Sequence, residues 1–247
     1  MKVALTCIAK DEDYYITEWL DYHLYLGFDK IFVYENDWKL NIDSPFIEKI
    51  SFDGPGRQEE AYNNFISNYG DEFDWVAFMD VDEFLVLKVH NNIKEFLSDY
   101  RDFNGVAINW YLFGDNNHST LNGNYSVLKR FTKRAKKIDS HVKCIVKPKS
   151  ISKYRIHCPD DESVVDTDKR VVLGPFNDNG NDHIAQINHY FTKTKIEWDK
   201  KLLRGRAPLD KNGNKVTRNE SDFIHHNINE VEDLYALNFF IKKSNIF

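Results

Sequence analysis

Residues 75–85, Trp-Val-Ala-Phe-Met-Asp-Val-Asp-Glu-Phe-Leu, are an apolar run that leads into two aspartates separated by one residue. The apolar part predicts a buried strand. Side chains alternate along an extended chain, so we expect Asp80 and Asp82 to point the same way beyond the strand. Oxygen ligands paired in this manner hold Mg²⁺ or Mn²⁺ together with phosphate oxygens and water. The plainer alternative is a solvated turn after a core strand.

The part of the chain around and before this segment alternates strand and helix patterns. We expect strands over residues 3–8, 30–34 and about 46–52, and helices over residues 14–26 and about 58–69. Strands separated by helices predict an α/β fold with a mainly parallel central sheet. Ligands of such sheets collect at the carboxyl ends of the strands, where the two aspartates are expected.

The downstream part is less regular. Strands are expected over residues 105–112, 125–131, 144–146 and 151–156. An acidic and exposed loop is expected over residues 160–168, and helices over residues 195–203 and 231–242. Internal repeats and low-complexity tracts, which would indicate a repeat architecture or a flexible linker, are lacking in the sequence.

Composition excludes several classes of protein. The formal net charge of −6 over 247 residues argues against a general nucleic-acid binder. The three cysteines are an odd number without C-x-x-C spacing, so we expect neither a zinc site nor a disulfide framework. Cys7 and Cys144 lie in apolar runs, which suggests that both are buried thiols. The apolar amino-terminal stretch is short, and no run approaches the roughly 20 apolar residues of a membrane span. These observations predict a soluble, cytoplasmic protein.

Further motifs lie in order along the chain from residue 3 to about residue 206. They include Cys7-Ile8-Ala9-Lys10-Asp11-Glu12, Glu18-Trp19-Leu20-Asp21-Tyr22-His23, Tyr34-Glu35-Asn36, Trp110-Tyr111-Leu112-Phe113-Gly114, His141-Val142-Lys143-Cys144 with His157, and Asn188-His189-Tyr190. Together with the Asp-x-Asp segment, they resemble family 2-like and family 92-like glycosyltransferases of the GT-A fold. The resemblance implies a Rossmann-like nucleotide-sugar-binding domain over residues 1–206, an irregular acceptor region within it, and a carboxyl-terminal helical extension over residues 207–247 that packs on it.

The resemblance also implies which positions contact a nucleotide-sugar donor. Six of them would line the base and ribose or lie beside the donor: Thr6, Ile8, Glu12, Asn36, Gln58 and Tyr62. Lys143 would face the donor phosphates. The loop and helix that carry Lys193, Lys201, Arg204 and Arg206 would close over the diphosphate as a cationic lid. The alternative is that these side chains form the exterior of a basic helix.

Asp80 and Asp82 would hold Mn²⁺ or Mg²⁺ in a protein of this group. His189 would complete the coordination, since imidazole is an acceptable ligand of Mn²⁺. The alternative for His189 is a histidine that is hydrogen-bonded within the structure and has no ligand.

Inverting transfer needs a carboxylate that deprotonates the acceptor hydroxyl. Asp115 is one candidate, because it follows the matched Phe113-Gly114 in an expected acceptor loop. Glu83 is the other, because it adjoins the aspartate pair. Spacing alone does not choose between them.

The expected function is therefore metal-dependent transfer of a hexosyl group, with inversion, from a nucleotide-sugar to a carbohydrate or glycolipid acceptor. Synthesis of a surface polysaccharide or lipooligosaccharide is the expected pathway. The basic stretch over residues 129–155 suggests attachment to the inner face of a membrane, or else a solvated surface. The alternatives are a Mg²⁺-dependent phosphohydrolase, which also carries Asp-x-Asp after an apolar strand, and a non-catalytic nucleotide-sugar-binding module.

Overall fold

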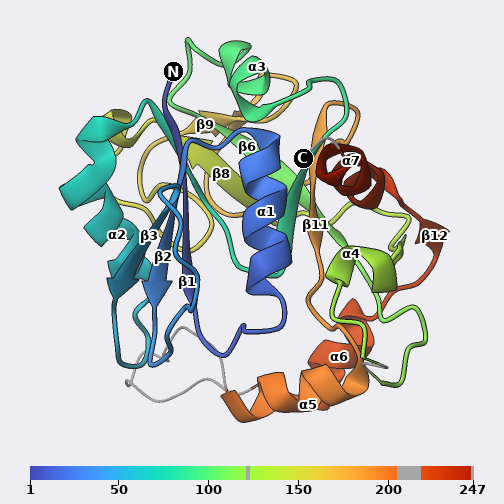
Figure 1. Cartoon of the computed structure of the whole chain (residues 1–247). Coiled ribbons are helices and arrows are strands. Elements are labelled where there is room, and N and C mark those ends of the chain that lie inside the picture. The colour runs from blue at the N-terminus through green and yellow to red at the C-terminus, as the bar shows by residue number, and fades with distance from the viewer. Residues whose placement is uncertain (121–122, 205–217, 246–247) are drawn as a thin grey trace.

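Strands and helices alternate through the first half of the chain in the computed structural model, which describes residues 1–120, 123–204 and 218–245 (Figure 1). The strands are β1 (Val3–Ala9), β2 (Lys30–Glu35), β3 (Ile47–Ser51), β4 (Trp75–Phe78), β5 (Glu83–Leu87), β6 (Gly105–Leu112), β7 (Lys133–Arg134), β8 (Val142–Val146), β9 (Val164–Val165), β10 (Val171–Val172), β11 (Ala185–His189) and β12 (Val231–Glu232). The helices are α1 (Ile16–Leu26), α2 (Gln58–Tyr69), α3 (Ile93–Ser98), α4 (Val127–Arg130), α5 (Lys195–Arg204), α6 (Glu220–His226) and α7 (Tyr235–Ser244).

One half of the central sheet is parallel. Its strands lie in the order β4-β1-β2-β3, and Leu5 at the middle of β1 pairs with Ile31 of β2 and Ala77 of β4. β1 and β4 are buried along almost their whole length, as expected for strands whose two faces are both covered. The strands and helices predicted for the first half are confirmed.

The other half of the sheet is mixed. β8 runs antiparallel to both β4 and β6, and β11 runs parallel to β6 but antiparallel to β5. The prediction of a mainly parallel sheet therefore holds only for β1 to β4. The reversal brings the amino end of β8, rather than its carboxyl end, beside the carboxyl end of β4, so residues that precede β8 also reach that edge of the sheet.

Alternate residues of β1 contribute to two apolar cores on opposite faces of the sheet. Leu5 packs in a core that includes Trp19 of α1, whereas Ala4 packs in a core that includes Phe65 of α2. Figure 1 shows α1 crossing the front of the sheet and α2 to one side of it. The three cysteines are buried and free, and the predicted burial of Cys7 and Cys144 is confirmed.

The aspartate segment forms a turn between β4 and β5 instead of continuing as an extended strand. The backbone N–H of Glu83 donates to the carbonyl of Asp80 at 3.0 Å, and the carboxylate of Glu83 accepts from the backbone N–H of Asp80 at 2.9 Å. The chain turns here because Glu83 already belongs to β5, which pairs with β11.

Two predicted strands are wrong. The end of the segment at residues 125–131 forms α4, because Ser126 caps the helix and the carboxylate of Glu18 accepts from the backbone N–H of Val127 at 2.6 Å. Residues 151–156 form no strand, because the N–H and carbonyl of Tyr154 bond to the side-chain amide of Asn63 rather than to a neighbouring strand.

Two other segments differ from expectation in part. The acidic loop at residues 160–168 is not fully exposed, since it contains β9 and the buried Asp166. The helix expected over residues 231–242 begins only at Tyr235, because Val231 and Glu232 form β12, which pairs with β7.

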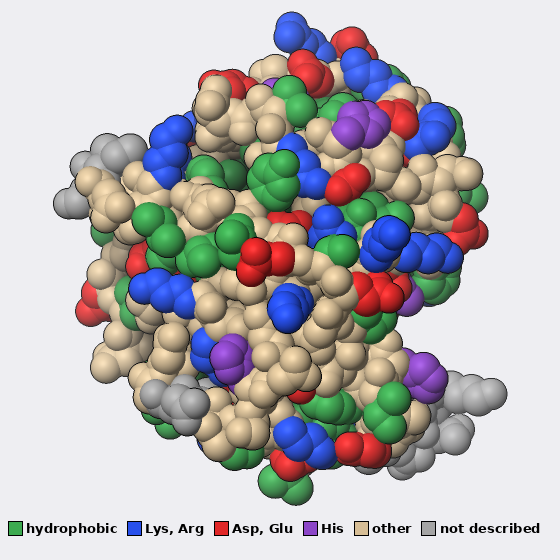
Figure 2. Space-filling model, turned by 90° about the vertical axis from the view of Figure 1, so that its right-hand side faces the viewer, with side chains coloured by type: hydrophobic (Ala, Val, Ile, Leu, Met, Phe, Trp, Pro, Cys, Tyr) green, Lys and Arg blue, Asp and Glu red, His purple; other side chains and the backbone are tan. Residues whose placement is uncertain are grey.

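The carboxyl-terminal part contains α6, β12 and α7, but the predicted boundary at residues 206 and 207 lies outside the described residues. Pairing of β12 with β7 brings acidic residues to the basic stretch, and Arg134 contacts Asp233 at 2.7 Å. Basic and acidic side chains are interspersed on the face of the molecule shown in Figure 2. Across the described residues, no helix has both the length and the apolar character needed to cross a membrane.

Candidate active site

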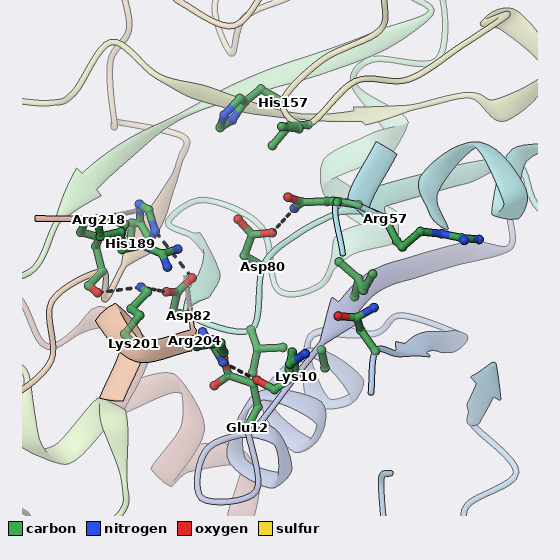
Figure 3. Close-up of a pocket in the computed structure, with 18 of the residues that line it drawn as sticks. Lys10, Glu12, Arg57, Asp80, Asp82, His157, His189, Lys201, Arg204 and Arg218 are labelled. Atoms are coloured by element: carbon green, nitrogen blue, oxygen red, sulfur yellow. Dashed lines mark hydrogen bonds and ion pairs between the residues drawn. The ribbon is translucent and has the colours of Figure 1, made fainter. Parts of the chain in front are cut away.

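A cavity of about 620 Å³ lies at the carboxyl ends of β1, β2 and β4 (Figure 3). The helices α2, α5 and α6 and the segments that flank β8 also contribute to its lining. Nine of the residues predicted to form the site line it: Ile8, Glu12, Asn36, Gln58, Asp80, Asp82, His189, Lys201 and Arg204. The location agrees with the rule that ligands of open α/β sheets bind at this edge.

Asp80 is held by donors from α2 and β8. The side-chain amide of Gln58 donates to one of its oxygens at 2.6 Å, and the Tyr62 hydroxyl lies 3.3 Å from the same oxygen. The Lys143 ammonium lies 3.4 Å from the other oxygen. Burial of Lys143 alone would lower its pKa, but Asp80 and Glu83 outweigh this effect and raise it. Lys143 is therefore a fixed positive charge behind Asp80.

Asp82 belongs to a second group of charges, with Lys201 and His189. Lys201 Nζ donates to Asp82 Oδ2 at 2.6 Å and to the carbonyl of Phe191 at 2.7 Å, while His189 Nε2 lies 3.6 Å from Asp82 Oδ1. Burial alone would raise the pKa of Asp82, but Lys201 and His189 hold it well below the ordinary value. Burial also lowers the pKa of Lys201 to about 8, although Asp82 opposes the shift.

Asp80, Asp82 and His189 have side chains of the kinds that bind Mg²⁺ or Mn²⁺, but they do not form a complete coordination shell. Both aspartates face the same cavity, and His189 Nδ1 is buried without a hydrogen-bond partner among the described residues. Burial lowers the pKa of His189, which favours the neutral form that binds metals. Within the described ranges, however, no group of three or more His, Cys, Asp or Glu side chains is arranged to hold a metal. Two carboxylates with phosphate oxygens and water are nevertheless sufficient for Mg²⁺.

Arg204 connects α5 to the segment that follows β1. Its guanidinium contacts the Glu12 carboxylate at 2.6 Å and donates to the carbonyl of Lys10 (Figure 3). The Lys10 ammonium in turn lies 2.8 Å from Asp37. Positive charge from α5 is thus held against the carboxyl end of β1, whereas Arg206 lies outside the described residues.

Asn36 shapes the cavity through its own side-chain bonds. Its amide donates to the carbonyls of Phe52 and Gly54 at 2.9 and 2.6 Å. These bonds tie the end of β2 to the loop that carries Pro55 and Arg57, both of which line the cavity. The Asn36 side chain therefore fixes one wall of the cavity.

Four other predicted donor residues lie outside the lining of this cavity. Tyr62 and Lys143 lie behind Asp80, and Thr6 is completely buried within β1. Lys193 lines a neighbouring cavity of about 300 Å³, which shares Glu12, Lys201 and Arg204 with the first.

The two predicted bases also lie outside the lining. Glu83 is fully buried, and burial raises its pKa well above the ordinary value. Asp115 accepts hydrogen bonds from the side-chain amides of Asn227 and Asn229 at 2.9 and 3.2 Å, so its carboxylate faces the carboxyl-terminal segment. Neither the Glu83 nor the Asp115 side chain is among the described residues that line the cavity.

Several aromatic and imidazole rings also line the cavity. The sequence did not indicate that these rings belong to the site. Trp110 of β6 stacks on His141 with ring centroids 4.9 Å apart, and its ring lies 4.3 Å from that of His189. His157 and Phe191 also line the cavity. Trp110, His141 and His157 belong to motifs quoted above, but they come from separate segments, so their spacing did not indicate a shared site.

Comparison with known proteins agrees with the resemblance seen in the sequence. A glycosyltransferase family 92 protein of Ricinus communis is 23% identical over 210 residues, which cover 76% of this chain and 35% of that protein. A family 92 protein of Arabidopsis thaliana is 27% identical over 111 residues, which cover 38% of this chain and 19% of that protein. This chain thus spans about a third or less of the length of these relatives.

Among solved structures, S. aureus TarS 1–349 is similar with a TM-score of 0.36 and 13% identity, over 60% of this chain and 47% of that chain. The model of the family described as glycosyltransferase family 92 matches residues 56–236, which include the turn with both aspartates and the ring group. The chain belongs to glycosyltransferase family 92.

Proposed function

We propose that this protein transfers a sugar from a nucleoside-diphosphate sugar to a hydroxyl group of a carbohydrate acceptor, with the help of Mn²⁺ or Mg²⁺. The observation that carries the proposal is the meeting of Asp80, Asp82, Lys201 and Arg204 in one cavity at the carboxyl edge of the parallel strands. Membership in family 92 supports a glycosyltransferase activity in general.

The arrangement of charge suggests the orientation of the donor. The diphosphate would lie near Asp82, Lys201 and Arg204, where two cations from α5 approach the aspartate turn. The base and ribose would lie against Ile8, beside the wall that Asn36 fixes. The sugar would then point toward Trp110 and the surrounding rings, since aromatic faces pack well against apolar faces of ligands.

Asp80, Asp82 and His189 are the residues that would hold the metal. When bound, the ion would neutralise charge that develops on the departing diphosphate. Gln58, Tyr62 and Lys143 would fix the carboxylate of Asp80, and Lys201 would supply positive charge of its own. Charges held in place in this way act on the transition state with little reorganisation.

Several finer features belong to the same proposal. We propose inversion at the anomeric carbon, a hexosyl donor, and a role in the synthesis of a surface polysaccharide or lipooligosaccharide. Attachment to the inner face of a membrane through the basic stretch is also proposed, although the acidic neighbours of β7 reduce its net charge.

Calorimetric titration of the protein with UDP, GDP and CDP, with and without Mn²⁺, tests the donor site. Wild-type protein should bind one nucleoside diphosphate more tightly with Mn²⁺, and Asp82→Asn should lose that metal-dependent part. Asp71→Asn is the matched control, because Asp71 lies almost fully exposed before β4 and away from the cavity lining. Failure of all three nucleotides to bind, with or without metal, would refute the proposal.

A further inference from the structure

Transfer to an acceptor hydroxyl requires a group that accepts the hydroxyl proton, and the cavity offers few carboxylates for this task. Glu12 is paired with Arg204, and Asp37 is paired with Lys10. Asp80 and Asp82 are the proposed metal ligands. Among the described residues, all carboxylates of the lining are therefore already engaged.

His141 has a different environment from these carboxylates. Its Nδ1 lies 2.7 Å from Oδ1 of Asp139, and its backbone N–H donates to the same oxygen at 2.8 Å. An ionised carboxylate only accepts hydrogen bonds, so Nδ1 carries the proton and Nε2 presents a lone pair. Nε2 has no hydrogen-bond partner in the described part of the chain, and the side chain is 39% exposed while lining the cavity.

The backbone of β6 fixes both members of this pair. The N–H of Asp139 donates to the carbonyl of Trp110 at 2.9 Å, and the N–H of Trp110 donates to the carbonyl of His141 at 3.1 Å. The side chain of Asn109 donates to the carbonyl of Asp139 at 2.9 Å. The imidazole also stacks on the Trp110 ring at an interplanar angle of 13°. The segment that carries the pair precedes β8 and is thus fixed against β6 by backbone hydrogen bonds.

The other histidines of the cavity are less suited to accept a proton. His189 is directed at Asp82, and Nδ1 of His226 lies 2.6 Å from the carbonyl of Asp222. Burial and the nearby Lys143 lower the pKa of His157 to about 3. His141 alone, among the described histidines of the lining, has a carboxylate on one ring nitrogen and an open second nitrogen that is not directed at a metal ligand.

We propose that His141 is the general base that deprotonates the acceptor hydroxyl and that Asp139 is its positioning residue. This inference rests on the proposed transferase function. The acceptor O–H proton moves to Nε2 of His141 as the oxygen forms a bond to the anomeric carbon. The bond between that carbon and the diphosphate oxygen breaks, and its electron pair leaves with the nucleoside diphosphate. The imidazolium is stabilised by the Asp139 carboxylate and then releases its proton to water.

The electrostatics of Asp139 agree with this role. Burial alone would raise the pKa of its carboxyl group, but the hydrogen bonds from His141 outweigh burial and lower it. Four groups face the imidazole: Asp139 from its own segment, Trp110 from β6, and His157 and Phe176 from later segments. Asp139 is the carboxylate among these four groups, so it supplies the negative charge that balances a protonated His141.

The test measures release of nucleoside diphosphate from UDP-glucose, UDP-galactose, UDP-N-acetylglucosamine and GDP-mannose, with Mn²⁺ and with water as the acceptor. His141→Gln should lower kcat by roughly 100-fold to 10,000-fold, the usual contribution of a general base, and should leave nucleoside-diphosphate binding unchanged. Free imidazole should partly restore turnover to His141→Ala. His90→Gln is the matched control, because His90 also pairs with an aspartate, Asp99 at 2.9 Å, and is absent from the cavity lining.

Asp139→Asn provides a readout that a purely structural role would not move. It should lower kcat with little change in KM and leave nucleoside-diphosphate binding unchanged, because the imidazolium that forms in the transition state loses its counter-charge. The proposal is overturned if His141→Gln binds the nucleotide normally and keeps kcat within threefold of wild type. Absence of turnover in wild-type protein with every donor would instead refute the proposed function, and the assignment of His141 with it.

Discussion

Replacing Glu197 with Gln should destabilise the protein strongly, because this carboxylate joins three elements inside the structure. It lies in the first turn of α5 and accepts two hydrogen bonds from the Arg130 guanidinium of α4, both at 2.8 Å. It also accepts from the Tyr15 hydroxyl before α1 and from Thr194. The side chains of Glu197 and Arg130 are each only 4% exposed, so the variant leaves a buried guanidinium without its counter-ion.

The magnitude follows from two separate considerations. Breaking a buried ion pair by removing one partner costs about 3–5 kcal/mol. Burial alone would raise the pKa of Glu197, but the donors outweigh it and lower the pKa from 4.5 to about 2. A shift of this size corresponds to about 3 kcal/mol of stability at neutral pH. The two values agree, and for a chain of this length they predict a fall in Tm of about 6–12 °C.

Thermal unfolding at pH 7 of wild type, Glu197→Gln and Asp199→Asn measures the effect. Asp199 is the control because it lies on the same helix and pairs with Lys195 at 2.6 Å on the exposed surface, where such pairs contribute about 0.5 kcal/mol or less. The depressed pKa of Glu197 also fixes the pH dependence. The contribution of the ionised Glu197 to stability is present above about pH 4.5 and is lost as the pH falls toward 2. The difference in Tm between wild type and Glu197→Gln should therefore narrow over that range. A fall in Tm no larger than that of Asp199→Asn would refute the reasoning.

Other predictions concern packing, thiols and the donor site. Gly105→Ala should lower stability by about 1–3 kcal/mol in urea unfolding, because a Cβ there would lie 2.8 Å from methyl carbons of Val146 and Val164; an unchanged midpoint would contradict this. The three buried thiols should react with Ellman's reagent only after denaturation, and rapid labelling of the native protein would show that one of them is accessible. Arg204→Met should weaken nucleoside-diphosphate binding about tenfold or more, because it removes the cation held by Glu12; calorimetry that shows unchanged affinity would exclude a role in binding.

Much of the first half of the fold could be predicted from the sequence, because its signals are local. The apolar stretches of β1 and β4 and the pattern of α1 depend on periodicity alone. The direction of β8 could not be predicted in this way, since antiparallel insertion between β4 and β6 depends on how a long intervening segment returns to the sheet. The same limitation explains the wrong strand at residues 151–156, where the side chain of Asn63 takes the place of a partner strand.

The candidate site was predictable where its residues lie at the ends of parallel strands. Asp80 and Asp82 were found through their place after β4, and both line the cavity. A matched motif before Asp115 predicts a place in the site, but Asn227, 112 residues away, binds its carboxylate and determines where it points. The sequence does not indicate His141 as a site residue, because the Trp110 ring on which it stacks belongs to β6, and no short spacing connects the two residues.

Metal-assisted turnover of a nucleotide-sugar in the cavity around Asp80 and Asp82 is the activity that we propose for this protein. The most direct measurement is release of nucleoside diphosphate from a panel of nucleotide-sugars with and without Mn²⁺, for wild type, Asp82→Asn and the Asp71→Asn control. We predict Mn²⁺-dependent release from one donor, retained in Asp71→Asn and reduced at least about 100-fold in Asp82→Asn. Cleavage of p-nitrophenyl phosphate with no release from any donor would indicate a phosphohydrolase. Tight binding of a nucleotide-sugar without turnover would indicate a non-catalytic module. Either result would contradict the proposed transferase activity.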